Sequence, residues 1–200
     1  VLFLAAIAIF LASDAKGQHR RHNRSPGPPT LGLDQGVMEL ETPDFTLELV
    51  NASQTVAALE PKNSNGFDFT PADQLTRRSA NGFYHLGDIN LRIRTTKQSA
   101  WTKVSTAAAR KPVTFLSVSG SDLVSSDLRP TLPANCPLHI VRTWTVDKGT
   151  LVLTFTITNK SAHNVEIGAL GIPLIFNNYI SGRSLDQAHA ICSFSDPAIG

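Results

Sequence analysis

From residue 36 onward, apolar and polar residues alternate in short runs that end at Gly, Pro, Asn or Asp. A period of two residues is typical of strands that bury one face and expose the other. The pattern therefore predicts an all-β fold, an antiparallel β-sandwich of eight strands with short connections. We expect these strands at residues 37–41, 45–50, 54–59, 89–95, 113–118, 138–146, 151–159 and 165–176.

The clearest predicted pair of strands is 138–146 with 151–159, in which most alternate residues are apolar. In the first of these strands Arg142 falls on the same face as Trp144, because side chains two residues apart share a face. The connection 147–149 predicts a three-residue hairpin loop whose glycine takes a positive φ.

The N-terminal residues do not follow the alternating pattern. Residues 1–11 are an uncharged apolar run of the length found in secretory signals, and Ser13 and Ala15 provide a small-residue cleavage site. We therefore expect residues 1–15 to be a signal peptide lacking its start, with a buried N-terminal helix as the alternative. The protein is then expected to be secreted and extracellular, with no membrane attachment after cleavage.

The remaining chain divides into a linker and a folded domain. Residues 16–33 are rich in Arg, Pro and Gly and are expected to form a flexible basic linker. Residues 34–200 are expected to form the β-sandwich domain, truncated at its C-terminus.

The composition is that of a globular chain, with 42% hydrophobic and 17% charged residues in 200. The net charge of +2 comes from the first 33 residues, which hold four basic residues and one acidic residue. The predicted domain is close to neutral, so nucleic acid is not an expected partner. Since no zinc-type Cys or His spacing and no Gly-rich phosphate loop occurs, we expect neither a metal site nor a cofactor.

If the chain is exported, its cysteines and two of its asparagines are candidates for covalent modification. Cys136 and Cys192 are the two cysteines, and an oxidising compartment permits a disulfide between them. Two unpaired buried thiols are the alternative. Asn51 and Asn159 each begin an Asn-X-Ser acceptor for N-linked sugar, although these asparagines also suit plain turns.

The most unusual segment is 177–189, which follows the last predicted strand. It gathers amide, guanidinium, carboxylate, imidazole and phenol groups, a mixture that commonly holds sugars on a loop fixed by a rigid scaffold. The alternative is a polar loop whose residues serve turns. The candidates for contact with substrate or with a neighbouring domain are Asn177, Asn178, Tyr179, Arg183, Asp186 and His189.

A second candidate cluster lies around the predicted strand 89–95. Arg92 and Arg94 project from one face of this strand, Asp88 precedes it, and Trp101 follows nearby. The cluster suits a binding face, a domain interface or a solvated outer face. Arg142 is a further secondary candidate.

Three stretches of sequence resemble a known protein family: residues 81–92, residues 142–144, and residues 168–173 together with 177–178 and 182–183. The family comprises secreted fungal and bacterial proteins of uncharacterised function that are related to glycoside hydrolases. In these proteins an N-terminal β-supersandwich, similar to galactose mutarotase, precedes an α-helical toroid.

The resemblance implies that this chain is the N-terminal β-sandwich portion of a glycoside hydrolase acting on polysaccharide or glycan. The catalytic helical domain would lie beyond Gly200 and would be a partner of this domain, so the chain alone is expected to be inactive. Its catalytic residues are unknown. The alternatives are a stand-alone carbohydrate-binding module and a structural extracellular protein.

Overall fold

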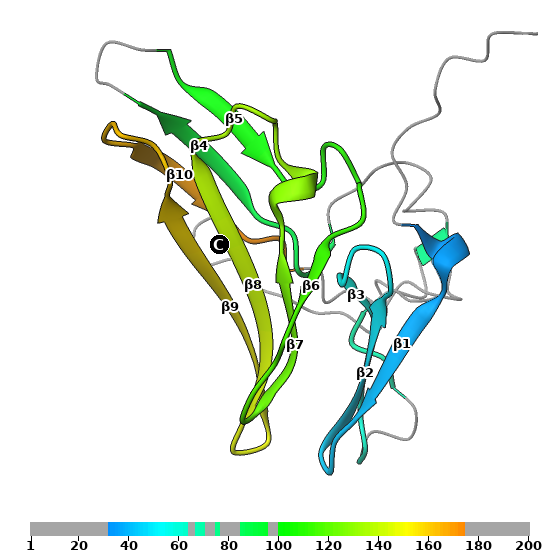
Figure 1. Cartoon of the computed structure of the whole chain (residues 1–200). Coiled ribbons are helices and arrows are strands. Elements are labelled where there is room, and N and C mark those ends of the chain that lie inside the picture. The colour runs from blue at the N-terminus through cyan, green and yellow to red at the C-terminus, as the bar shows by residue number, and fades with distance from the viewer. Residues whose placement is uncertain (1–31, 64–66, 71–74, 77–84, 96–99, 175–200) are drawn as a thin grey trace, which may run out of the picture.

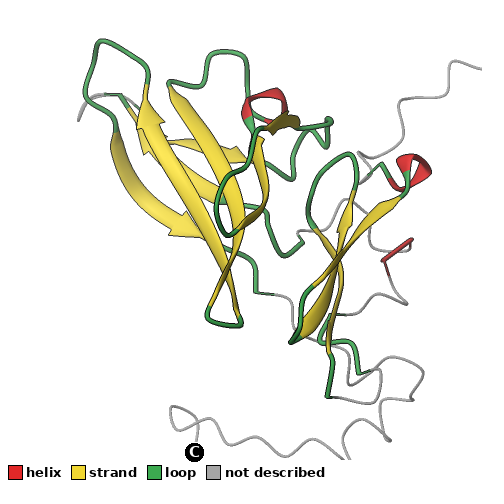
Figure 2. Ribbon diagram, turned by 60° about the horizontal axis from the view of Figure 1, so that its bottom comes forward, coloured by secondary structure: helices red, strands yellow, loops and turns green. Residues whose placement is uncertain are grey.

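The computed structural model of the chain describes residues 32–63, 67–70, 75–76, 85–95 and 100–174. Strands joined by loops and short helical turns make up this part of the molecule (Figure 2). The expected all-β antiparallel sandwich is confirmed. The strands are β1 (Val37–Glu41), β2 (Phe45–Val50), β3 (Val56–Pro61), β4 (Asn90–Arg94), β5 (Thr102–Ser105), β6 (Thr114–Leu116), β7 (Asp122–Asp127), β8 (Leu138–Asp147), β9 (Thr150–Asn159) and β10 (Glu166–Gly171), and 3-10 turns are found at η1 (Leu33–Gln35) and η3 (Arg129–Thr131).

The described strands form three antiparallel sheets in two layers. The base sheet has the order β6-β7-β8-β9, cover sheet 1 has the order β1-β2-β3, and cover sheet 2 has the order β10-β4-β5. The two cover sheets lie toward opposite ends of the long β8–β9 hairpin (Figure 1). One face of the base sheet is therefore shared by two separate sheets.

The alternation along β8 explains how this shared face is filled. Leu138 and Ile140 are buried against cover sheet 2, whereas Trp144 is buried against cover sheet 1. Arg142 falls between them in the same alternation and is 1% exposed. The prediction that Arg142 and Trp144 share a face is confirmed, and this face is the inner one.

The β8–β9 hairpin closes more tightly than the sequence predicts. Asp147 pairs with Thr150, which leaves a loop of two residues rather than three. Lys148 has a φ of 49° and Gly149 a φ of 79°. Positive φ at both positions defines a type I′ turn, whose twist matches that of the flanking strands.

The other differences are two strands that were not predicted and two strand boundaries that lie at other residues. β5 and β7 were not predicted, because β5 has a single buried apolar residue and β7 buries Ser125 and Ser126. β3 begins two residues later than expected, after a turn in which Gln54 has a φ of 51°. β10 ends at Gly171, short of the predicted strand end at 176.

Candidate functional site

The most unusual predicted segment lies outside the described residues, as does Cys192. Cys136 is half-buried in the loop before β8, and its pairing with Cys192 stays a prediction. The binding roles predicted for the segment after β10 also stay predictions, for Asn177, Asn178, Tyr179, Arg183, Asp186 and His189.

The second predicted cluster is divided by its own strand into an outer and an inner part. The side chains of Arg92 and Arg94 lie on the outer face of β4, whereas Leu91 and Ile93 lie in the core. Asp88 does not join the arginines, because it precedes β4 and is 1% exposed in the interior. The sequence thus grouped residues that belong to two different environments.

The outer part is organised around Trp101. The guanidinium carbon of Arg94 lies 4.4 Å from the centroid of the Trp101 ring, and that of Arg92 lies 5.1 Å from it. Both distances are within the range of a cation–π interaction. Arg94 also donates two hydrogen bonds, at 2.9 Å and 2.6 Å, to one carboxylate oxygen of Glu166 on β10.

The register of cover sheet 2 extends this outer face across all three strands. Lys103 of β5 pairs with Arg92 and is exposed, while Glu166 of β10 pairs with Arg94. We call the five residues Arg92, Arg94, Trp101, Lys103 and Glu166 the Trp101 face. It carries three cations and one carboxylate.

A glycine makes room for the indole ring on this face. A Cβ atom added at Gly168 of β10 would lie 2.5 Å from a ring carbon of Trp101. Any side chain at this position would therefore displace the ring. The absence of a side chain at Gly168 allows Trp101 to lie over β10.

The inner part is a buried ion pair. Arg110 approaches the Asp88 carboxylate at 3.0 Å, and both side chains are 2% exposed. Asp88 also accepts hydrogen bonds from the backbone N–H of His85 at 2.8 Å and from the Thr106 hydroxyl at 2.9 Å. These partners satisfy the buried carboxylate, so its role is to hold the loops around β4 and β5 together.

Arg142 occupies the junction of all three sheets. Its guanidinium donates to the carbonyl of Ser53, next to cover sheet 1, and at 2.7 Å to the carbonyl of Gly87, next to cover sheet 2. Burial lowers its pKa to about 10, although the nearby Asp88 favours the charged form. Arg142 remains charged at neutral pH and ties both cover sheets to the base sheet.

The close approach to Arg142 requires a glycine at position 87. Gly87 has a φ of 107°, and a Cβ atom there would lie 3.1 Å from the Trp144 ring and 3.2 Å from the Arg142 guanidinium. Both the backbone conformation and the space exclude a larger residue. Gly87 therefore allows the loop before β4 to reach the Arg142 guanidinium, and a binding role for Arg142 stays a prediction.

Two cavities of about 180 Å³ and about 320 Å³ meet at Pro133 and Cys136. The described residues around them include Arg94, Lys111 and Arg129 but no carboxylate. Glycoside hydrolysis normally requires a pair of carboxylates. The described lining of these cavities does not supply that pair.

The two predicted glycosylation motifs differ in their surroundings. Ser53 of the first motif is 7% exposed, and the Asn51 side chain donates a hydrogen bond to the carbonyl of Gln35 at 2.8 Å. Asn159 is exposed at the end of β9, where its amide caps a turn with Ser161. Glycosylation at either asparagine stays a prediction.

Two further findings concern membranes and metals. No helix within the described part of the chain is long and apolar enough to cross a membrane. In the same residues, no group of three His, Cys, Asp or Glu side chains is placed to hold a metal ion.

The fold and its surface define an antiparallel β-sandwich protein with a cationic, tryptophan-centred outer face. Residues 48–200 match the model of a family of unknown function (DUF5695). The match covers most of the chain, which therefore belongs to this family. Among curated proteins and among solved structures, none matches the chain.

Proposed function

We propose that this chain is the β-sandwich portion of a secreted carbohydrate-active protein, a glycoside hydrolase acting on polysaccharide or glycan. The bond-breaking residues belong to a helical domain outside this chain. The sandwich contributes sugar binding and supports that domain. The observation that carries the proposal is the Trp101 face, where strands hold an aromatic ring and guanidinium donors together on one surface.

Sugar recognition suits this face because guanidinium groups are planar donors that reach two oxygens at once. Strands fix such donors more rigidly than loops do, which lowers the entropy lost on binding. The buried carboxylate Asp88 is occupied by Arg110 and by hydrogen bonds of the fold. The proposal therefore assigns sugar binding to this chain and bond cleavage to the rest of the protein.

The test compares the complete gene product with the 200-residue chain on a broad panel of polysaccharides. We expect the complete product to release reducing sugars and this chain to bind the same polysaccharides without releasing any. If the complete, folded product neither binds nor cleaves any member of the panel, the proposal is wrong.

A stand-alone carbohydrate-binding module is the second candidate, and the same Trp101 face favours it. The two candidates differ in one result. Binding without any sugar release by the complete gene product would favour the binding module over the hydrolase.

A further inference from the structure

The Trp101 face has more positive charge than its own residues neutralise. Glu166 is paired with Arg94 through two hydrogen bonds. Within the described residues, no ion pair is formed by Arg92 or by Lys103. Both side chains are exposed and lie opposite each other on neighbouring strands. The face therefore presents two unneutralised cations beside a neutralised one.

Trp101 holds two of these cations, Arg92 and Arg94, close together on one surface. Two arginines on one strand face repel each other, and each also attracts the indole ring, at 4.4 Å and 5.1 Å. The ring thus keeps both guanidiniums on the same surface, although their charges favour separation. Such preorganised donors bind an anion with less loss of side-chain entropy than flexible surface cations would.

We propose that the Trp101 face binds an acidic glycan, a polysaccharide whose sugars carry carboxylates. This inference rests on the proposed carbohydrate function and names its ligand class. The inference is supported by charge complementarity, because the carboxylates of the sugars would contact the cationic side chains of Arg92 and Lys103, next to Arg94.

The spacing of the cations matches a polymer better than a single small anion. Arg92 and Arg94 are two residues apart on β4, so their backbone positions are about 7 Å apart. Lys103 lies across from Arg92 at about 5 Å, again measured between backbone positions. Separations of this order resemble the length of one sugar ring. Successive carboxylates of an acidic glycan therefore reach successive cations across the flat sheet.

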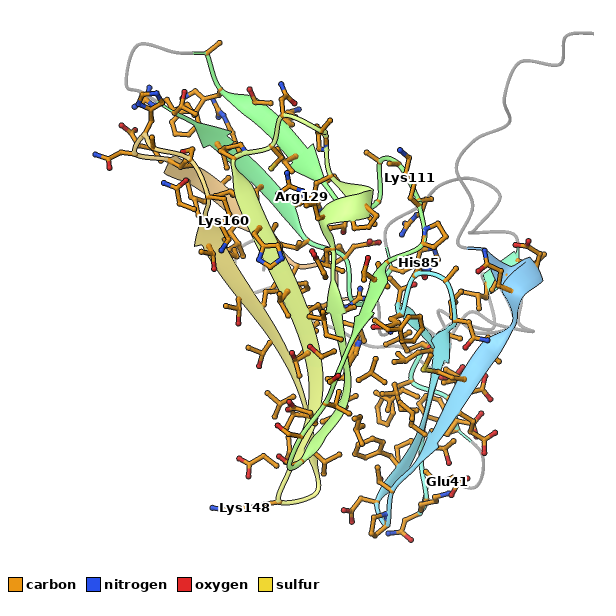
Figure 3. All side chains as sticks on the ribbon, viewed as in Figure 1. Glu41, His85, Lys111, Arg129, Lys148 and Lys160 are labelled. Atoms are coloured by element: carbon orange, nitrogen blue, oxygen red, sulfur yellow. The ribbon has the colours of Figure 1, made fainter. Side chains whose placement is uncertain are left out.

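The experiment measures binding of the full 200-residue chain to polygalacturonate at low and at physiological salt. The matched ligand is the same polymer with its carboxylates methyl-esterified, which removes the charge and keeps the sugar. The variants are Arg92→Gln and the double substitution Arg92→Gln with Lys103→Gln. The control is Lys148→Gln, which removes one exposed charge at the tip of the β8–β9 hairpin, away from β4 and β5 (Figure 3).

We expect the chain to bind polygalacturonate at least tenfold more tightly than the esterified polymer, with a smaller difference at higher salt. Arg92→Gln should weaken binding about fivefold to tenfold and the double variant further, since each removes a charged donor. Lys148→Gln should leave binding unchanged. All three variants replace exposed side chains, and equal thermal unfolding would show that the fold is intact.

Three results would overturn the inference. Equal binding of the charged and esterified polymers would show sugar recognition without charge, which contradicts the acidic ligand and leaves the proposed function standing. Equally tight binding of polyglutamate would show that the face recognises charge without sugar. Failure to bind either polymer, while the chain binds other polysaccharides, would reject the acidic glycan and keep the carbohydrate function.

Discussion

Arg142 and Arg94 are the same residue type in two opposite environments of one molecule. Arg142 is 1% exposed and donates to backbone carbonyls from both cover sheets. Arg94 lies on the outer face of cover sheet 2, against Trp101 and Glu166. Arg142 is enclosed by the sandwich, whereas Arg94 lies beside Arg92 and Lys103, which are exposed and accessible to a ligand.

The comparison indicates that the buried cation stabilises the fold, whereas the surface cations contribute to ligand binding. The guanidinium of Arg142 loses its water of hydration and recovers part of that cost through its carbonyl partners. Its removal should therefore destabilise the sandwich. The outer arginines keep their hydration in part, so their removal should change binding and leave the fold nearly as stable.

The largest effect is expected for Arg142→Met. This substitution leaves the carbonyls of Ser53 and Gly87 buried without their donor, at a cost of about 1–3 kcal/mol each. We expect a loss of about 3 kcal/mol or more in the free energy of unfolding, measured by urea denaturation. The matched control Arg92→Met should cost less than about 1 kcal/mol. Equal losses for the two variants would contradict the comparison.

A smaller effect is expected for Gly87→Ala, which changes the loop that contacts Arg142. The backbone at position 87 has a φ of 107°, which alanine rarely adopts, and the added Cβ would lie 3.1–3.3 Å from Trp144, Arg142 and Thr55. We expect a loss of about 1–3 kcal/mol in unfolding free energy. Gly120→Ala is the control, because Gly120 also has a positive φ but faces open space. A Gly120→Ala loss as large as that of Gly87→Ala would mean that the close approach to Arg142 has no importance.

On the outer side, Gly168→Ala tests whether Trp101 positions the arginines. The new methyl group would displace the indole ring, and we expect severalfold weaker binding of polygalacturonate with little change in stability. Gly171→Ala on the same strand is the control, since its Cβ would contact only Asn90 at 3.9 Å. The affinity for polygalacturonate is measured by titration calorimetry. An affinity that is unchanged in both variants would show that Trp101 does not organise the face.

The smallest effect concerns an acidic surface on cover sheet 1. Burial and the neighbouring carboxylates of Glu39, Glu60 and Asp68 raise the pKa of Glu48. A raised pKa of an acid means that the charged form destabilises the fold at neutral pH, and that protonation removes this penalty as the pH falls through the raised value. Glu48→Gln should therefore be more stable at pH 7 by about 0.2–1 kcal/mol.

The stability gain of Glu48→Gln should disappear below about pH 4, where the wild-type carboxyl is protonated in both states. Thermal unfolding of the wild-type protein and of Glu48→Gln between pH 7 and pH 3 measures this gain. A gain that is the same at pH 7 and pH 3 would show that charge is not its cause.

The sequence predicted the main part of the fold because its alternation is strong where strands have one buried face. β1 and β2 lie at the predicted residues. The β8–β9 hairpin differs by one residue at the end of β8, by one at the start of β9 and by one in its loop. β7 was missed since it buries serine side chains, which carry no apolar signal. The turn of residues 148–149 was predicted one residue too long because Asp147 suits a loop as well as a strand end.

The candidate site was predicted in part. Alternation placed Arg92 and Arg94 on one outer face, and it placed Arg142 beside Trp144. Nothing in the spacing indicated that Asp88 would turn inward to Arg110, which is 22 residues away. Nor did it indicate the contribution of Glu166 and Gly168, which reach the Trp101 face only because β10 pairs with β4.

The sequence by itself determined the fold class and the buried face of strands such as β4 and β8, because a period of two residues is a local property of the chain. It also determined the positive φ of Gly149 in the β8–β9 turn. Only the tertiary structure decided which cations are buried and which are accessible. That choice depends on strands that are distant in the sequence and adjacent in the sheet. Arg142 is buried because two cover sheets meet over it, whereas Arg92 is exposed because the outer face of cover sheet 2 points away from the base sheet.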